Sequence, residues 1–430
     1  MATAKLAIEG GTPLRTQPFG PKWIFGEEER RQLMEVMDNA PTGWRSQFKV
    51  KAFADAFATM HGASYAVATT SGTGAIHAAV AAINPEPGDE IITTPTTDIG
   101  SVLGILLHNA IPVFADWDPD TFNSDPADIE RRITSRTRAI LVVHLYGNPC
   151  DMDAILEIAR AHQLPVIEDC SQAHLAEYRS RKVGVIGDIG CFSLGGKTLT
   201  TDQGGMIITN NEELARRAMG FSRKGAEMDS ALRSSLAPTS YQHGSARGYA
   251  FLGDFHPMTD LNAAVGLAQL GRWEEAVRVR RQTAAILDEM VPHLPGFKIQ
   301  KVQPHDRSGY YLYAYTVDKA EAGVSSERFA EAVRAEGIPD CLGPYIQGRP
   351  LYRYPIFAEE QTYGQSRYPF VDEEGRRRID YSTLHLPHIE RELPKTGFIL
   401  LRNSYTEQDA KDIGAAMRKV AEHYSEGSPF

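Results

Sequence analysis

The sequence lacks the long apolar runs and the leader-like start that mark membrane and secreted proteins. No run of about eighteen apolar residues occurs, so the sequence predicts no helix that spans a membrane. The first residues, MATAKLAIEGG, contain no basic segment followed by an apolar one, and we therefore expect no signal peptide. The expected location is the cytoplasm.

Paired cysteines and an excess of basic residues are also missing. The four cysteines are scattered without a C-x-x-C pair, which argues against a zinc site and favours free thiols in a reducing compartment. They are Cys150, Cys170, Cys191 and Cys341. A net charge of −10 argues against nucleic acid or an anionic membrane as a partner. A small anionic ligand stays open, because it needs only local positive groups.

A complete phosphate loop is the last notable absence. The letters GGKT, residues 195–198, look like the end of G-x-x-x-x-G-K-[ST], but the first glycine of that pattern would fall on Cys191. The nearest glycine, Gly190, stands one position early. The register therefore argues against a P-loop nucleotide site.

The stretch from Gly190 to Gly205 is notable instead for one lysine, Lys197, among small residues and hydroxyls. Small neighbours let a flat ligand approach the backbone, hydroxyls can bind an anion, and a lysine amine can condense with an aldehyde to a Schiff base. These capacities fit pyridoxal 5'-phosphate, which has an aldehyde, an aromatic ring and a phosphate. A surface lysine in a loop of glycine and threonine is the competing interpretation of this stretch alone.

From residue 65 onward, short apolar runs alternate with helical patterns. The runs typical of strands are 65–70, 90–94, 111–117, 140–146, 165–169 and 205–209. The alternation predicts an α/β fold, with a mostly parallel central sheet flanked by helices on both faces. Ligands of such sheets bind at the carboxyl ends of the strands, so the residues just after each strand are candidates for a site.

Two of these positions carry suitable chemistry. The segment SGTGA, residues 71–75, joins a strand to a helix, where backbone amides form an anion site; a simple N-cap is the competing interpretation. Asp169 ends an apolar strand, and a buried carboxylate needs a partner such as a protonated ring nitrogen. Gln172, three residues on, can hydrogen-bond a ring hydroxyl. The ordered set of phosphate turn, acid and Lys197 predicts pyridoxal phosphate more strongly than any part of it.

The pattern divides the chain into three parts. Residues 1–25 are rich in glycine and proline and predict an irregular N-terminal arm. Residues 26–270 are expected to form a large pyridoxal-phosphate-binding domain, and residues 271–430 a smaller α+β C-terminal domain. A long helix over about 260–290 is expected to connect them. The composition of residues 340–395 predicts a long, partly irregular segment that either forms the outer wall of the pocket or is exposed to solvent.

A series of motifs follows along the chain: GGTP, YAVATTSGTGAIHAAV, PGDEIITTP, IPVFADWDPDTFN, VVHLYGNPCDMDAI, IEDCSQAH, GDIGCFS, KTLTTDQGGMIITN, MTDLNAAVGLAQL and LPHIER. In this order they resemble the DegT-type family of nucleotide-sugar and aminocyclitol aminotransferases, which are pyridoxal-phosphate enzymes of fold type I. The resemblance covers most of the length.

The resemblance implies roles for several residues. Lys197 is then the Schiff-base lysine and a catalytic residue, Asp169 is the catalytic partner of the pyridinium nitrogen, and Gln172 lies near the ring hydroxyl. The implied phosphate ligands are Gly72, Thr73 and Ser193, and the Ser71 hydroxyl is expected at the same anion site. Family members are usually homodimers with shared active sites, so the loops around Trp44 and Phe255 are expected to reach a neighbour's site.

The sequence departs from the family pattern at three places. Where the family has P-x-x-T-[FW], the segment PTTDIG puts Asp98 at the threonine and Ile99 at the aromatic, so an aliphatic side chain is expected to cover the cofactor. The segment SLGGK is one residue shorter than the usual serine-to-lysine spacing. GDFHPM replaces G-x-N-[YF]-R-M with Phe255, His256 and Pro257. Neutral drift is one interpretation of this change, and a new acid–base or binding role for His256 is the other.

The leading functional hypothesis is an aminotransferase that moves an amino group from glutamate or glutamine to a keto-sugar, keto-cyclitol or nucleoside-derived carbonyl in sugar or antibiotic biosynthesis. The alternative is a pyridoxal-dependent reaction without net amino transfer: oxygen-dependent oxidation, elimination or a carbon–carbon bond change. A regulator without turnover is disfavoured by the lysine and the acid together. No metal is expected. The residues expected near the substrate are Trp44, Asp98, His144, Tyr146, Phe255 and His256.

Overall fold

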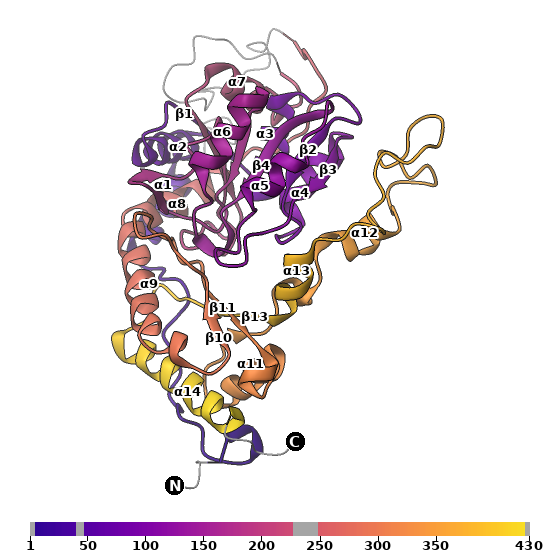
Figure 1. The fold of residues 1–430 in the computed structure, drawn as a ribbon. Helices are drawn as coiled ribbons and strands as arrows, with labels where there is room; N and C mark the ends of the chain where they lie inside the picture. The colour runs from indigo at the N-terminus through magenta and orange to yellow at the C-terminus, as the bar shows by residue number, and fades with distance from the viewer. Residues whose placement is uncertain (1–4, 40–46, 227–247, 426–430) are drawn as a thin grey trace.

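The fold combines a large sheet covered by helices with a smaller sheet beside it (Figure 1). The structure is a computed structural model and describes residues 5–39, 47–226 and 248–425. One seven-stranded sheet and one four-stranded sheet dominate it. The prediction of an α/β fold with a smaller α+β part at the C-terminal end is confirmed, and the predicted divisions after residues 25 and 270 stay predictions.

The large sheet is mostly parallel. Its strands are β1 (Tyr65–Thr69), β2 (Glu90–Thr93), β3 (Ile111–Phe114), β4 (Thr137–Val143), β5 (Val166–Asp169), β8 (Ile189–Ser193) and β9 (Gly205–Thr209). They lie in the order β1-β9-β8-β5-β4-β2-β3, and only β9 runs antiparallel to its neighbours. The carboxyl ends of β1, β2, β4, β5 and β8 therefore meet at one edge of the sheet.

Helices cover both faces of this sheet. One face packs against α3 (Gly72–Ile83), α4 (Gly100–Leu107) and α7 (Glu212–Phe221). The other packs against α2 (Phe48–His61), α6 (Met152–His162) and α8 (Asp260–Leu270). Neighbouring residues of one strand pack into the two different cores. Ile91 belongs to the first core, on the α3 face, and Ile92 to the second core, on the α2 face. Burial on both faces explains why the strands appear as continuous apolar runs in the sequence. The remaining elements here are α1 (Glu27–Asp38), α5 (Pro126–Arg131), β6 (Glu177–Tyr178) and β7 (Arg181–Lys182).

The small sheet is antiparallel, in the order β10-β11-β13-β12. Its strands are β10 (Phe297–Ile299), β11 (Leu312–Val317), β12 (Cys341–Leu342) and β13 (Thr396–Leu400). The helices with it are α9 (Trp273–Asp288), α10 (Lys319–Ala322), α11 (Ser326–Ala335) and α14 (Glu407–Ser425). They enclose a third hydrophobic core.

The expected single helix over 260–290 is wrong, because α8 ends at Leu270 and α9 begins at Trp273. Glycine is a poor helix former, and Gly271 is followed by Arg272 with φ −127° and ψ 12°, outside the helical region. The break lets α8 pack on the large sheet while α9 runs along α14 (Figure 1).

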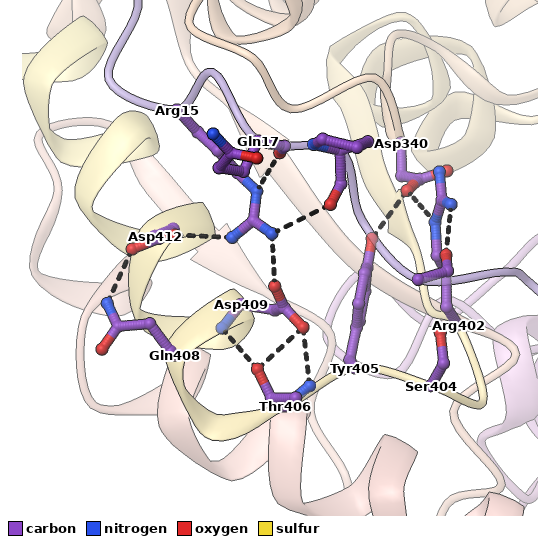
Figure 2. Close-up of polar contacts among 12 residues, drawn as sticks. Arg15, Gln17, Asp340, Arg402, Ser404, Tyr405, Thr406, Gln408, Asp409 and Asp412 are labelled. Carbon is purple, nitrogen blue, oxygen red and sulfur yellow. Dashed lines mark hydrogen bonds and ion pairs between the residues drawn. The ribbon is translucent and has the colours of Figure 1, made fainter.

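The N-terminal segment lies against the C-terminal part of the chain. Leu6 is buried in the third core. Figure 2 shows Arg15 between two carboxylates of α14, with Nη2 2.7 Å from Asp409 and Nη1 2.6 Å from Asp412. Arg402 Nη1 donates to the carbonyl oxygen of Gly20 at 2.7 Å. In the described residues 5–25, the arm has one short 3-10 turn, Ala7–Glu9. Ion pairs and backbone hydrogen bonds hold the rest of these residues in place.

The irregular segment expected at 340–395 covers the edge of the large sheet. It holds the short helices α12 (Pro355–Ala358) and α13 (Pro387–Glu392). The hydroxyl of Tyr381 donates to the carbonyl oxygen of Pro112 at 2.6 Å, and the Phe357 ring lies 5.3 Å from that of Phe114. Covering an edge strand removes a surface on which another chain could pair.

All four cysteines are buried and free. None of the helices in the described part of the chain combines the length and apolarity needed to cross a membrane.

A buried imidazole in the second core makes stability depend on pH. His61 Nδ1 donates to the Phe57 carbonyl oxygen at 3.0 Å, while its Nε2 has no hydrogen-bond partner among the described residues. Burial lowers the pKa of His61 to about 4. An unfolded imidazole has a pKa near 6.5, so the unfolded state binds the proton first as the pH falls. The contribution of His61 to the free energy of unfolding is therefore fully present above about pH 6.5. About 3 kcal/mol of it is lost as the pH falls to about 4.

Urea unfolding at several pH values between about 8 and 5 measures this loss. His61→Leu is expected to flatten the dependence, whereas His305→Gln, at a half-exposed imidazole, is expected to leave it unchanged. An equally steep dependence in wild type and His61→Leu would contradict the assignment.

Candidate active site

A cavity of about 210 Å³ opens at the carboxyl edge of the large sheet. Its lining comes from the last residues of β4, β5 and β8 and from the segments that follow β1, β2, β5 and β8. The lining residues are Ser71, Gly72, Thr73, Ile76, Thr97, Asp98, Gly100, Ser101, Val143, Asp169, Ser171, Gln172, Ser193, Gly195, Lys197 and Gln203. The structure thus brings most of the residues predicted to bind the cofactor to one place.

The loop that carries Lys197 is clamped at both ends by His174. Nδ1 of His174 accepts from the backbone N–H of Leu199 at 3.2 Å, and Nε2 lies 3.0 Å from the carbonyl oxygen of Ser193. One nitrogen accepts and the other donates, so the imidazole is neutral. Burial lowers the pKa of His174 to about 3, which agrees with that neutral state.

Two distant segments hold the middle of the same loop. Trp23, in the N-terminal segment, donates its Nε1–H to the Lys197 carbonyl oxygen at 2.8 Å. Asn403 donates its side-chain N–H to the carbonyl oxygen of Thr198 at 2.8 Å. The Lys197 Nζ lies 4.4 Å from the centroid of the Tyr311 ring. The lysine therefore projects from a fixed backbone toward the cavity, beside an aromatic ring from the C-terminal half.

Asp169 is a buried carboxylate, 2% exposed, at the end of β5. Its Oδ2 accepts from the Ser101 hydroxyl at 2.7 Å, and its Oδ1 accepts from the Ser171 N–H at 2.9 Å. No ion pair to Asp169 occurs within residues 5–39, 47–226 and 248–425. A buried carboxylate without a cation is unfavourable, so this position suits a ligand that brings a protonated nitrogen.

Gln172 bridges the two halves of the chain. Its Oε1 accepts from the backbone N–H of Tyr146 at 2.8 Å, and its Nε2 donates to the Tyr345 hydroxyl at 2.9 Å. A side-chain amide has two N–H groups, so one remains for a ligand hydroxyl.

The start of α3 forms an anion site. The Ser71 side chain caps Gly74 N at 3.0 Å, and the first intrahelical bond runs from Ala75 N to the Ser71 carbonyl oxygen. The N–H groups of Gly72 and Thr73 precede that bond and are available to an anion. A Cβ at Gly72 would lie 2.5 Å from the Cβ of Ser193. Only glycine lets the helix begin this close to the end of β8, and Ser193 reaches the site despite the shortened loop.

These groups fit pyridoxal phosphate. The helix N-terminus and the Ser193 hydroxyl suit its phosphate, the uncompensated carboxylate of Asp169 suits its protonated ring nitrogen, and the Lys197 amine suits its aldehyde. The Ile76 and Val143 side chains add apolar surface to the lining. None of the lining residues of the described cavity is aromatic, and Ile99, the aliphatic residue expected to cover the cofactor, is not among them.

Several residues of the predicted site lie elsewhere. Ile99 precedes α4 and packs against the first core instead of lining the cavity. Tyr146 is buried, with its ring 5.1 Å from that of Tyr345. Phe255 is half-exposed, and the Lys224 ammonium lies 4.6 Å from the centroid of its ring. His256 lies beside the first turn of α3. Trp44 lies outside the described residues.

His144 is also absent from the cavity lining, because it is fully buried behind the sheet edge. Its Nδ1 accepts from Cys150 N at 3.0 Å, and its Nε2 lies 3.1 Å from Oε2 of Glu168. Glu168, also fully buried, accepts three backbone N–H bonds from Gly184, Ile186 and Gly187 at 2.6–2.8 Å. Burial alone would raise the pKa of Glu168, but the bonds from His144 and from the backbone outweigh it and lower the pKa. This network fixes β5 directly before Asp169.

Glu168→Gln is expected to reduce the free energy of unfolding by about 3–5 kcal/mol, because it removes one partner of a buried charge network and points an amide N–H at backbone donors. Urea unfolding near neutral pH measures the loss. Glu374→Gln, at an exposed glutamate, is the matched control and is expected to change stability little. Equal stability of the two variants would contradict the structural importance of the Glu168 network.

Comparison with known proteins gives matches over nearly the whole chain. The model of the DegT/DnrJ/EryC1/StrS aminotransferase family matches residues 24–391. The chain is 34% identical over 444 residues to the L-glutamine:2-deoxy-scyllo-inosose aminotransferase of Streptoalloteichus tenebrarius, covering 98% of each chain. It is 37% identical over 327 residues to the GDP-perosamine synthase of Caulobacter vibrioides, covering 75% of this chain and 81% of that one. The solved structure of an aminotransferase from Psychrobacter cryohalolentis superposes with a TM-score of 0.77 at 29% identity, over 93% of this chain and 98% of that one.

Proposed function

The chain belongs to the DegT/DnrJ/EryC1/StrS aminotransferase family, and from this premise we propose that it transfers the amino group of L-glutamine or L-glutamate to a ketone of a cyclitol or a nucleotide sugar. As a member of this family it is a pyridoxal-phosphate-dependent enzyme. The names of two relatives, an L-glutamine:2-deoxy-scyllo-inosose aminotransferase and a GDP-perosamine synthase, support this substrate class and a place in antibiotic or sugar biosynthesis.

One observation carries the proposal. Lys197, the buried carboxylate of Asp169 and the amide-lined start of α3 face one cavity. The amides of Gly72 and Thr73, with the hydroxyls at Ser71 and Ser193, would hold the phosphate of the cofactor. Asp169 would hold its ring nitrogen and Gln172 its ring hydroxyl. When bound, pyridoxal phosphate supplies an electron-withdrawing ring that stabilises negative charge on the amino-bearing carbon of a substrate.

The chain's own residues supply the proton transfers. Asp169 would keep a proton on the ring nitrogen, because its charge is buried and, among the described residues, is balanced by two neutral hydrogen-bond donors. The Lys197 Nζ, when neutral, would take the proton from the amino-bearing carbon of the donor as a general base, and would then deliver it as a general acid to the carbon of the cofactor's former aldehyde. Its backbone is held by His174, Trp23 and Asn403, so the amine returns to the same position for both transfers.

A second candidate function is pyridoxal chemistry without net amino transfer. It is favoured by the lining of the cavity, where Asp98 places an exposed carboxylate and no aromatic ring is present among the described residues. Such a lining would suit reaction of the amino-bearing carbon with oxygen, elimination or a carbon–carbon bond change.

Mixing the cofactor-loaded protein with L-glutamine or L-glutamate, with and without oxygen, separates the two functions. Amino transfer predicts that the visible absorption of the cofactor is lost with one equivalent of keto acid, independently of oxygen. An absorption that no donor changes, or that changes only with oxygen, would overturn amino transfer and favour the second candidate.

We also propose that the enzyme is a cytoplasmic homodimer with shared active sites and no nucleic-acid or membrane partner. Exposed large apolar side chains support association. They are Ile24, Phe25, Met34 and Met37 near α1, and Tyr249, Leu252 and Phe255 before α8. The net charge of −10 supports the absence of a polyanionic partner. Light scattering coupled to size-exclusion chromatography tests the dimer, and a monomer at micromolar concentration would contradict it.

A further inference from the structure

A second cluster of functional groups lies beside the start of α3, outside the cavity. His77 lies on α3, one helical turn after Thr73, and Asp254 and His256 lie in the loop before α8. The His256 Nε2 is 3.1 Å from Oδ2 of Asp254 and 3.3 Å from Nδ1 of His77. The third side of the triangle, from His77 Nδ1 to Asp254 Oδ2, is 3.8 Å. Three potential ligand atoms from two separate segments therefore point at one position.

Hydrogen bonds alone do not account for this convergence. A neutral imidazole nitrogen carries either one hydrogen or one lone pair. The Nε2 of His256 cannot direct one hydrogen well at both the Asp254 carboxylate and the His77 nitrogen. A cation at the centre would instead accept a lone pair from each of the three atoms.

The spacing of the three atoms matches a metal site. Ligands at about 2.0–2.1 Å from a tetrahedral ion lie about 3.3–3.4 Å apart, and the three distances here are 3.1, 3.3 and 3.8 Å. Two imidazoles and a carboxylate suit zinc and its first-row neighbours. The Asp254 side chain is 54% exposed, so an ion can reach the three atoms from the surface of the chain.

Backbone contacts hold the loop that carries two of the ligands. His256 N donates to the Ser222 carbonyl oxygen at 3.0 Å, and its own carbonyl oxygen accepts from Thr70 N at 2.9 Å. Asp254 N donates to the Phe221 carbonyl oxygen at 2.9 Å. The loop is thereby tied to the end of α7 and to the end of β1. His77 is 8% exposed, with its ring 4.7 Å from those of Phe221 and His108. The ligands are preorganised before an ion arrives.

The other such cluster in the described part of the chain, His144, Glu168 and Cys170, is already satisfied by internal hydrogen bonds. Glu168 already accepts bonds from three backbone N–H groups and from His144. The scattered cysteines predicted no metal site, and His77 is too far along the chain from Asp254 and His256 to form a recognisable motif with them.

We propose that His77, Asp254 and His256 bind one divalent first-row transition ion, of the zinc type, with an open fourth position. The ion ties the loop before α8 to α3 next to the anion site of the cavity. The proposal is independent of the reaction that the cavity catalyses.

The test is a titration of chelator-stripped, cofactor-loaded enzyme with Zn²⁺ against a chromophoric competitor, together with the visible spectrum of the Co²⁺-loaded enzyme. Wild type is expected to bind one equivalent and to give the intense spectrum of a four-coordinate Co²⁺ site. Asp254→Asn and His77→Gln are expected to weaken Zn²⁺ binding by about 100-fold or more. His305→Gln, at a half-exposed imidazole elsewhere, is the matched control and is expected to bind as wild type does.

Asp254 is exposed, so its variant is expected to fold even if His77→Gln does not, and the cofactor's absorption verifies folding of each variant. Wild type that binds no Zn²⁺ above the level of Asp254→Asn would overturn the proposal. Equal binding by wild type and both ligand variants would place the ion elsewhere and would overturn it too.

Discussion

Lys197→Ala is expected to lower amino transfer by about 10⁴-fold or more, because it removes both the group that condenses with the cofactor aldehyde and the general base. The variant is expected to fold normally, since the contacts that hold this loop use backbone atoms: Trp23 and Asn403 bond the carbonyl oxygens of residues 197 and 198. The loss is therefore chemical. Single-turnover rates with L-glutamine measure it.

A covalent readout separates this role from a structural one. Borohydride reduction of the cofactor-loaded enzyme is expected to label one peptide, the one containing Lys197, and to label none in Lys197→Ala. Lys319→Ala, at an exposed lysine on α10, is the matched control and is expected to keep full rate and labelling. A variant that retains turnover within about tenfold of wild type, or labelling at another lysine, would remove Lys197 from its proposed role.

The sequence was sufficient to predict those site residues that are positioned by the strand or loop directly before them. Ser71, Asp169 and Lys197 each follow an apolar run, and the edge of a parallel sheet gathers such positions whatever the order of the strands. The strand β8, which leads to Lys197, was not predicted, since the glycine in IGCFS weakens its strand pattern. The antiparallel direction of β9 was also invisible, because both faces of a buried strand are apolar in either direction.

His144 was expected near the substrate, and its position outside the cavity lining has a geometric cause. Side chains alternate between the two faces of a strand, and Val143 and Asp169, which both line the cavity, are paired across β4 and β5. The neighbours of those two residues, His144 and Glu168, point away from the cavity and bond to each other. Strand-end position alone predicts nearness to the site, and only the register between strands tells which side chains face it.

Contacts between residues far apart along the chain were missed for a different reason. Trp23 is 174 positions from Lys197, and Tyr345 is 173 from Gln172. Neither contact leaves a periodic signal, because each depends on how the arm and the small sheet pack against the large one. His174 did carry a signal, its place in IEDCSQAH five residues after Asp169, but its role as a clamp needed the positions of Ser193 and Leu199.

The second large effect is expected at Asp169. Asp169→Asn keeps the size of the side chain and its bond from Ser171 N, but removes the negative charge that would hold the ring nitrogen protonated. Removal of the carbon-bound proton of the donor is expected to slow by about 10²–10³-fold, while borohydride labelling of Lys197 persists. Asp169→Asn thus slows proton removal but keeps the labelling, whereas Lys197→Ala loses both. This difference separates the roles of the two residues. Asp153→Asn, at an exposed carboxylate paired with Arg179, is the matched control.

Ser101 offers a graded version of the same test, because its hydroxyl donates to Oδ2 of Asp169 at 2.7 Å. Ser101→Ala removes a hydrogen bond to a charged group, worth about 1.5–3 kcal/mol, and is expected to slow the same step by about 10-fold or more and to shift the pH dependence of the cofactor's absorption. Ser101→Thr keeps the hydroxyl and is expected to restore both.

If Asp169→Asn removes the donor's proton at more than half the wild-type rate, the buried carboxylate has a structural role only. If Ser101→Ala then changes rate without changing the pH dependence, the hydroxyl acts on the fold of the cavity and not through the charge of Asp169.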